Sequence, residues 1–221
     1  MIDVVSATRL SRDDFWDKSA LGNSLKRLAG DDRIASRVFF SNQTGLPERY
    51  NECIRSDDSD EILVFMHDDV WIDDYFLADR VLEGLRSYDL IGVAGVLRRI
   101  PGQPPFANVD PHGERPRISG AIAQGPSPFA PIQVWESAPA DCDLLDGVFL
   151  AARTSVLREH RVLFDPEFDF HLHDADFCRA AKRAGLRVGT WPISLTHQSA
   201  GSYRSDGWWK AFERYLAKWG D

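Results

Sequence analysis

The feature that most constrains the fold is a run of five apolar residues that ends abruptly in polar side chains. The run extends from Ile62 to Met66, and His67, Asp68 and Asp69 follow it directly. A continuous apolar run of this length, rich in β-branched residues, predicts a strand buried on both faces, as in parallel sheets. Because ligands of open α/β sheets bind beyond the carboxyl ends of the strands, the three polar residues mark the expected functional site. Capping of the next helix is the alternative role for Asp68 or Asp69.

Strand-like and helix-like segments alternate through the first half of the chain. Strands are expected at residues 2–7, 38–40, 62–66 and 91–96. Helices are expected at residues 11–29, at 47–56 and after Asp73 or Asp74, either of which can cap the third helix. This alternation predicts an α/β protein with a mixed, mainly parallel central sheet flanked by helices, in a single compact domain.

The amino-acid composition changes between residues 101 and 131, where eight of the twelve prolines fall. A long irregular segment in a compact domain is either disordered or functional, and we expect a functional loop here. Further strands are expected at 132–135, 144–152, 188–191 and 195–197. The domain, residues 1–221, therefore divides into a first half (1–97), a Pro/Gly-rich loop (98–131) and a second half (132–221).

Composition narrows the class of protein. The net charge is −8 and the pI is near 5.2, which argues against nucleic acid as the main partner. Cys53, Cys142 and Cys178 are odd in number and far apart, so we expect a reducing compartment and no disulfide framework. The sequence has no transmembrane segment of about 20 apolar residues. We expect a cytoplasmic protein, with peripheral attachment to a membrane as the alternative.

A second polar cluster lies between residues 164 and 176, where two histidines and five carboxylates stand among aromatic residues. Burial among aromatic rings destabilises a charged carboxylate and raises its pKa toward the range of a general base. Asp174 and Asp176 are the candidates for this role. Since a helix begins close to them, capping is the alternative.

The third polar feature is His197, at the end of the short apolar segment 193–197. A histidine at a strand end is commonly a structural hydrogen-bonding residue. Together with a carboxylate and the oxygens of a diphosphate, however, a neutral imidazole suits Mn²⁺ or Mg²⁺. Asp69 and His197 are therefore the candidate metal ligands.

Taken in order, these features resemble the GT-A fold nucleotide-sugar glycosyltransferases, specifically the family 2-like group. His67, Asp68 and Asp69 match the family's DxD-type motif at its last position, with His67 in place of the first aspartate. The family's segment of the kind FDE…ED-x-D, its later Gly and its terminal His correspond to Phe164-Asp165-Pro166-Glu167, His173-Asp174-Ala175-Asp176, Gly185 and His197. The resemblance spans nearly the whole chain.

The resemblance implies an inverting transfer of a sugar from a nucleotide-diphosphate sugar donor to a glycan, lipid-linked or small-molecule acceptor. It assigns the general base to Asp174 and the metal ligands, for Mn²⁺ or Mg²⁺, to Asp69 and His197. It places the donor nucleotide near Thr8, Arg9, Asn42, Asn51, His67 and Asp68, and the sugar and acceptor near Asp146, Gly147 and Asp176.

Two other functions fit parts of the sequence. The spacing of His171, His173, Asp174 and Asp176 is close to that of metal-dependent hydrolases, in which His and Asp ligands hold ions that generate hydroxide. The histidine at position 67 also fits a catalytically inactive module that binds a sugar nucleotide or a glycan.

Overall fold

The computed structural model describes residues 1–57, 61–106, 117–199 and 204–220. The part of the expected loop at residues 107–116 lies outside this range. Within the described residues, none of the helices combines the length and apolar character needed to cross a bilayer.

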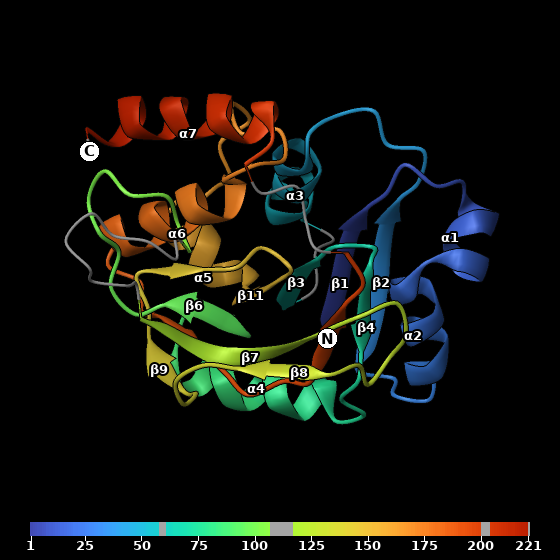
Figure 1. Ribbon diagram of the computed structural model, residues 1–221. Helices are drawn as coiled ribbons and strands as arrows, with labels where there is room; N and C mark the ends of the chain where they lie inside the picture. The colour runs from blue at the N-terminus through green and yellow to red at the C-terminus, as the bar shows by residue number, and fades with distance from the viewer. Residues whose placement is uncertain (58–60, 107–116, 200–203, 221) are drawn as a thin grey trace.

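A seven-stranded sheet runs through the centre of the molecule (Figure 1). Its order is β2 (Ile34–Phe39), β1 (Ile2–Ala7), β3 (Ile62–Met66), β11 (Phe149–Arg153), β5 (Leu90–Gly92), β12 (Val188–Thr190) and β9 (Ala140–Asp141). Strands β2, β1 and β3 are parallel to one another, as are β5 and β12. Strand β11 inserts antiparallel between β3 and β5, so the sheet is more mixed than the alternation of segments predicted.

A second sheet lies against the carboxyl-terminal edge of the first. Its order is β10 (Leu144–Leu145), β6 (Ala94–Val96), β7 (Ile118–Gln124), β13 (Leu195–His197) and β4 (Val70–Ile72), with β8 (Ile132–Val134) paired to β7. Strand β7 falls inside the segment that was expected to be a loop. The polypeptide thus returns to the end of β3 from several distant parts of the sequence.

Two segments expected to be single strands are each divided between the sheets. Residues 91–96 split at Val93, whose carbonyl accepts a hydrogen bond from Ala121 N at 3.2 Å and so leads the chain toward β7. Residues 144–152 split where Val148 N donates to Asp146 Oδ1 at 3.0 Å, which closes a turn. The single-strand predictions were wrong because tertiary pairing, and not the apolar pattern, decides where each strand ends.

Helices cover both faces of the central sheet (Figure 1). One face carries α3 (Leu46–Arg55), α5 (Thr154–Glu159), α6 (His173–Arg183) and α7 (Asp206–Trp219). The other carries α1 (Arg12–Lys18), α2 (Ala20–Leu28) and α4 (Leu77–Ser87). Leu63 and Phe65 pack against the first set of helices, whereas Val64 and Met66 pack against the second. The apolar run is therefore buried on both faces, as predicted.

Two expectations about helix ends were wrong. The helix predicted over residues 11–29 is two helices, because Ser19 adopts an extended conformation and its Oγ accepts from Gly22 N at 2.8 Å to start α2. Neither Asp73 nor Asp74 caps α4. Asp73 instead accepts from Thr196 Oγ1 at 2.6 Å and so joins the segment before α4 to β13.

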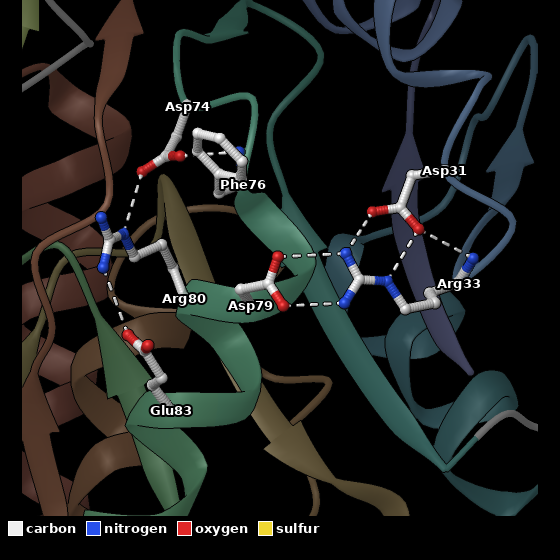
Figure 2. A network of polar contacts seen from close by, with 7 residues as sticks. All are labelled: Asp31, Arg33, Asp74, Phe76, Asp79, Arg80 and Glu83. Carbon is white, nitrogen blue, oxygen red and sulfur yellow. Dashed lines mark hydrogen bonds and ion pairs between the residues drawn. The ribbon is translucent and has the colours of Figure 1, made fainter.

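A polar network fastens α4 to the start of β2 (Figure 2). The guanidinium of Arg33 lies between Asp31, at 2.7 Å, and Asp79 of α4, at 2.8 Å. A second group joins Arg80 to Asp74 and Glu83. Because most of these side chains are partly exposed, each ion pair contributes little to the stability of the fold.

Candidate active site

The carboxyl ends of β1 and β3 lie side by side and open into one cavity. The parallel register pairs Val5 with Phe65, which brings Ala7 close to the residues that follow β3. The cavity has a volume of about 590 Å³. Its lining includes most of the predicted site residues: His67, Asp68, Asp69, Asp146, Gly147, Asp174 and His197. The structure thus brings both halves of the chain to the predicted edge of the sheet.

Asp69 and His197 are direct neighbours in this cavity. The Asp69 Oδ2 and His197 Nε2 atoms are 3.3 Å apart. Strand β13 pairs antiparallel with β4 and sets His197 opposite Val70, while Gln198 N donates to the Asp69 carbonyl at 2.8 Å. Backbone pairing therefore fixes the contact between the two side chains.

The contact changes the acidity of both groups. Burial alone would raise the pKa of Asp69, but the hydrogen bond and charge of His197 outweigh it and lower the pKa to about 2. Burial likewise opposes a charge on His197, yet the Asp69 carboxylate raises the pKa of this imidazole above its usual value. Asp69 is consequently a carboxylate throughout the physiological pH range.

His67 is the third member of the cluster. One ligand atom each from His67, Asp69 and His197 lie within 4.8 Å of one another, and this is the one such group among the described residues. The buried Nε2 of His67 has no hydrogen-bond partner in the described part of the chain. Burial, followed by the nearby His173, lowers the pKa of His67 to about 4, so its imidazole is neutral at pH 7. A neutral imidazole with an unpaired ring nitrogen is able to coordinate a metal ion.

Asp68 points away from this cluster and toward β1. Its Oδ2 accepts a hydrogen bond from the Thr8 hydroxyl, and Thr8 Oγ1 in turn accepts from Leu10 N at 3.1 Å. Burial has the largest effect on the pKa of Asp68 and raises it, although the hydrogen bond from Thr8 acts to lower it. The two residues join the loops that leave β1 and β3.

Asp174, in the first turn of α6, also lines the cavity. Its Oδ2 accepts from Gly147 N at 2.9 Å, and its Oδ1 accepts from Ala175 N at 2.8 Å. Asp146 also lines the cavity, and burial together with the charge of Asp174 raises its pKa. The backbone turn at Asp146 and Gly147 therefore supports the Asp174 carboxylate.

Other predicted site residues lie outside the cavity lining. Arg9 is exposed, and Asn42, in the loop after β2, accepts from Arg49 Nε of α3 at 3.0 Å. Asn51 is buried and exchanges hydrogen bonds with the backbone of Phe164, at 2.7 and 2.9 Å. Asn51 thus joins α3 to the segment before α6.

Asp176 has a partner in the C-terminal helix. Its carboxylate is 1% exposed and accepts from Trp219 Nε1 at 2.8 Å and from Lys218 Nζ at 2.9 Å. Asp174 and Asp176 are close in sequence, yet one faces the cavity and the other faces α7.

Sequence reasoning missed the aromatic wall of the cavity and the place of His173. Phe106, Trp135, Phe170 and Trp208 line the cavity together with His171 and His173. The His67 ring stacks on Phe170, with centroids 5.7 Å apart. Trp208 of α7 is both a core residue and part of the cavity lining, and apolar periodicity cannot separate these two positions.

Neither a protein-family model nor a curated protein matches this sequence. Among solved structures, the crystal structure of GalNAc-T7 with UDP, GalNAc and Mn²⁺ aligns with a TM-score of 0.55 at 11% identity, over 98% of this chain and 48% of that one. S. aureus TarS 1-349 aligns at 0.48 and 10% identity, over 89% and 60% of the two chains. The catalytic domain of Drosophila β1,4-galactosyltransferase 7, in complex with xylobiose, aligns at 0.44 and 12% identity, over 93% and 73%.

The chain therefore spans about half the length of GalNAc-T7 and adopts its fold. This likeness confirms the GT-A type α/β fold expected from the sequence, with a central sheet flanked by helices in one compact domain. A shared fold does not fix the reaction, which has to be argued from the site itself.

Proposed function

We propose that this protein is a glycosyltransferase, which moves a sugar from a nucleotide-diphosphate sugar to an acceptor hydroxyl with inversion at the anomeric carbon. One observation carries the proposal: the cluster of His67, Asp69 and His197 and the carboxylate of Asp174 open on the same cavity of a GT-A fold. A transferase of this kind needs positive charge for the leaving diphosphate and a base for the acceptor, on either side of one sugar.

His67, Asp69 and His197 are the proposed metal ligands. The fit rests on the His67 Nε2 atom, which is buried without a hydrogen-bond partner in the described part of the chain. Close to it lie Asp69 Oδ2 and His197 Nε2, which are 3.3 Å apart. A bound divalent ion would offset the negative charge that develops on the departing diphosphate. Two imidazoles and one carboxylate suit Mn²⁺ better than Mg²⁺, which prefers oxygen ligands. GalNAc-T7, of the same fold, was crystallised with Mn²⁺.

Asp174 is the proposed general base. Asp174 lines the cavity, and its Oδ2 atom accepts from Gly147 N at 2.9 Å, which orients the carboxylate. It would take the proton of the acceptor hydroxyl as that oxygen attacks the anomeric carbon. A single displacement by this oxygen inverts the configuration of the sugar.

The donor and acceptor are assigned to opposite ends of the cavity. Asp68 and Thr8, at the ends of β3 and β1, are proposed to border the nucleotide. Asp146 and Gly147 are proposed to border the sugar. Trp135 and Trp208 offer aromatic faces on which a glycan acceptor, or the glycan part of a lipid-linked acceptor, can pack.

Calorimetric titration with UDP, GDP, CDP and dTDP, each with and without Mn²⁺, tests the proposal. We expect one nucleotide to bind in a Mn²⁺-dependent manner, and Asp69→Ala to lose that dependence. The matched control is Asp79→Asn, because Asp79 pairs with Arg33 on the outer face of α4. Failure of every nucleotide to bind the wild-type chain would rule out the transferase.

A hydrolase with His171, His173, Asp174 and Asp176 as ligands receives less support. The first three of these residues line the cavity, but among the described residues the four do not form a group with metal-ligand spacing. Two ions bound per chain in the absence of nucleotide would favour the hydrolase over the transferase.

A further inference from the structure

His173 is a buried histidine with a hydrogen-bond partner at one of its two ring nitrogens in the described part of the chain. The residue is 3% exposed and starts α6, directly before Asp174. Its Nδ1 atom contacts the carbonyl oxygen of Phe170. A carbonyl can only accept, so Nδ1 carries the proton and, in the neutral ring, Nε2 is an acceptor. That Nε2 atom is buried and has no partner in the described part of the chain.

The free Nε2 atom faces the cavity beside Gly147. A Cβ built on Gly147 would lie 3.2 Å from His173 Nε2 and 3.2 Å from Asp174 Oδ2. The two acceptor atoms therefore border the same space, and the lack of a side chain at position 147 keeps it open. On the other side, the rings of His173 and His67 have their centroids 6.1 Å apart. His173 thus lies between the carboxylate of Asp174 and the cluster formed by His67, Asp69 and His197.

This position decides which part of a substrate can reach Nε2. If the diphosphate lies at His67, Asp69 and His197 and the acceptor hydroxyl lies at Asp174, the group between them is the transferred sugar. Sugars carry hydroxyl donors, whereas a diphosphate offers only acceptors at neutral pH. An unpaired buried acceptor favours a ligand that brings a donor to it.

We propose that His173 is a sugar-binding residue, whose Nε2 accepts a hydrogen bond from a hydroxyl of the transferred sugar. The inference rests on the proposed glycosyltransferase function. The contact holds the sugar between leaving group and base, and it makes the site selective for donors with a hydroxyl at that point. The bond from Nδ1 to Phe170 fixes the ring and so directs Nε2 into the cavity.

Two substitutions separate the two nitrogen atoms of the ring. His173→Asn retains an amide NH₂ near the position of Nδ1, so the bond to Phe170 is kept, but it has no atom at the position of Nε2. His173→Gln places its amide near the position of Nε2 and thus restores a polar group there. Thermal unfolding of both variants checks that α6 still starts correctly.

Calorimetry supplies the readout in the presence of Mn²⁺. The probes are UDP-glucose, UDP-N-acetylglucosamine, UDP-galactose and GDP-mannose, each compared with its own nucleoside diphosphate. For the donor that binds the wild-type chain, we expect His173→Asn to weaken the nucleotide sugar about tenfold, the value of one neutral hydrogen bond, and the free diphosphate less than about twofold. We expect His173→Gln to recover part of the loss.

Three outcomes would overturn the inference. The first is equal weakening of nucleotide sugar and free diphosphate, and the second is no weakening of either. The third is a second Mn²⁺ ion per wild-type chain that His173→Asn removes, since Nε2 would then be a metal ligand. If the wild-type chain binds no nucleoside diphosphate at all, the proposed function fails first and the inference fails with it.

Discussion

The Asp69 carboxylate and the His197 imidazole lie 3.3 Å apart, although one follows β3 in the first half of the chain and the other ends β13 near the C-terminus. The pairing of β13 with β4 fixes their distance, because it sets His197 opposite Val70. The backbone therefore holds the cluster in place before any ligand arrives, which lowers the conformational cost of binding one.

The first prediction concerns metal binding. We expect Asp69→Asn to weaken Mn²⁺ by more than about 100-fold, the upper end of what a mere outer-shell partner contributes. The reason is that Asp69 supplies the one negative charge of the cluster. Calorimetry or the electron paramagnetic resonance of free Mn²⁺ measures the change. An affinity within threefold of wild type would remove Asp69 from the ligand set, provided that Asp79→Asn, on the outer face of α4, also binds normally.

The second prediction concerns the choice of ion. His67→Asp restores the first aspartate of a DxD-type motif and replaces a nitrogen ligand by oxygen. We expect this variant to gain affinity for Mg²⁺ relative to Mn²⁺ by about tenfold, because Mg²⁺ prefers oxygen ligands. Competition between the two ions, followed by the Mn²⁺ resonance signal, measures the ratio. An unchanged ratio would show that His67 does not touch the ion.

The position of the site could be predicted from the sequence, but its composition only in part. The strand Ile62–Met66 is apolar throughout, so its burial could be expected whichever elements cover it. The polar residues that follow it must then lie at the carboxyl end of the sheet. The partner of Asp69 depends instead on a non-local pairing that local patterns do not encode. The resemblance placed His67 near the donor nucleotide, and no local pattern shows that His67 lies within reach of His197.

The division of polar residues between site and scaffold was equally hidden. Asp174 and Asp176 lie two positions apart at the start of one helix, so they project in different directions. Which of them faces the cavity depends on where α7 packs, and that helix comes thirty residues later in the chain. Their local sequence context made both residues candidates for the general base, and tertiary packing places them in different surroundings.

The third prediction concerns the proposed base. We expect Asp174→Asn to lower the rate of sugar transfer by about 100-fold or more while nucleotide affinity stays the same, since loss of a general base costs that much. The asparagine carbonyl can still accept from Gly147 N, so the turn is preserved. Asp169→Asn is the matched control, because the Asp169 side chain is exposed and the contact with Leu46 N is made by its backbone carbonyl, which the substitution keeps. Transfer at the wild-type rate by Asp174→Asn would mean that another group is the base.

The fourth prediction concerns Asp176, which the resemblance places near the acceptor. Its buried carboxylate binds Trp219 and Lys218, so we expect Asp176→Ala to destabilise the chain by about 2 kcal/mol through loss of these bonds. Urea unfolding followed by tryptophan fluorescence measures the loss. If Asp176→Ala instead keeps wild-type stability and raises the KM for the acceptor, Asp176 is a substrate-binding residue.

The last prediction is a pH dependence in the same corner of the fold. The Asp165 carboxylate lies 2.6 Å from Lys218 Nζ. Burial would raise the pKa of Asp165, but the hydrogen bond from Lys218 outweighs it, so the pKa is lowered. A carboxyl whose pKa is lower in the folded chain stabilises that chain above its unfolded value, near 3.9, and loses the contribution as pH falls through the folded pKa.

Asp165→Asn should therefore be less stable than wild type at pH 6, by less than about 1 kcal/mol because both partners are partly exposed. The difference should shrink as the pH falls below about 5, since the wild-type carboxyl is then protonated first in the unfolded chain and, at lower pH, in the folded chain as well. Urea unfolding of both chains at a series of pH values measures it. A difference that stayed constant down to pH 3 would show that Asp165 contributes to the free energy of unfolding through packing and not through its charge.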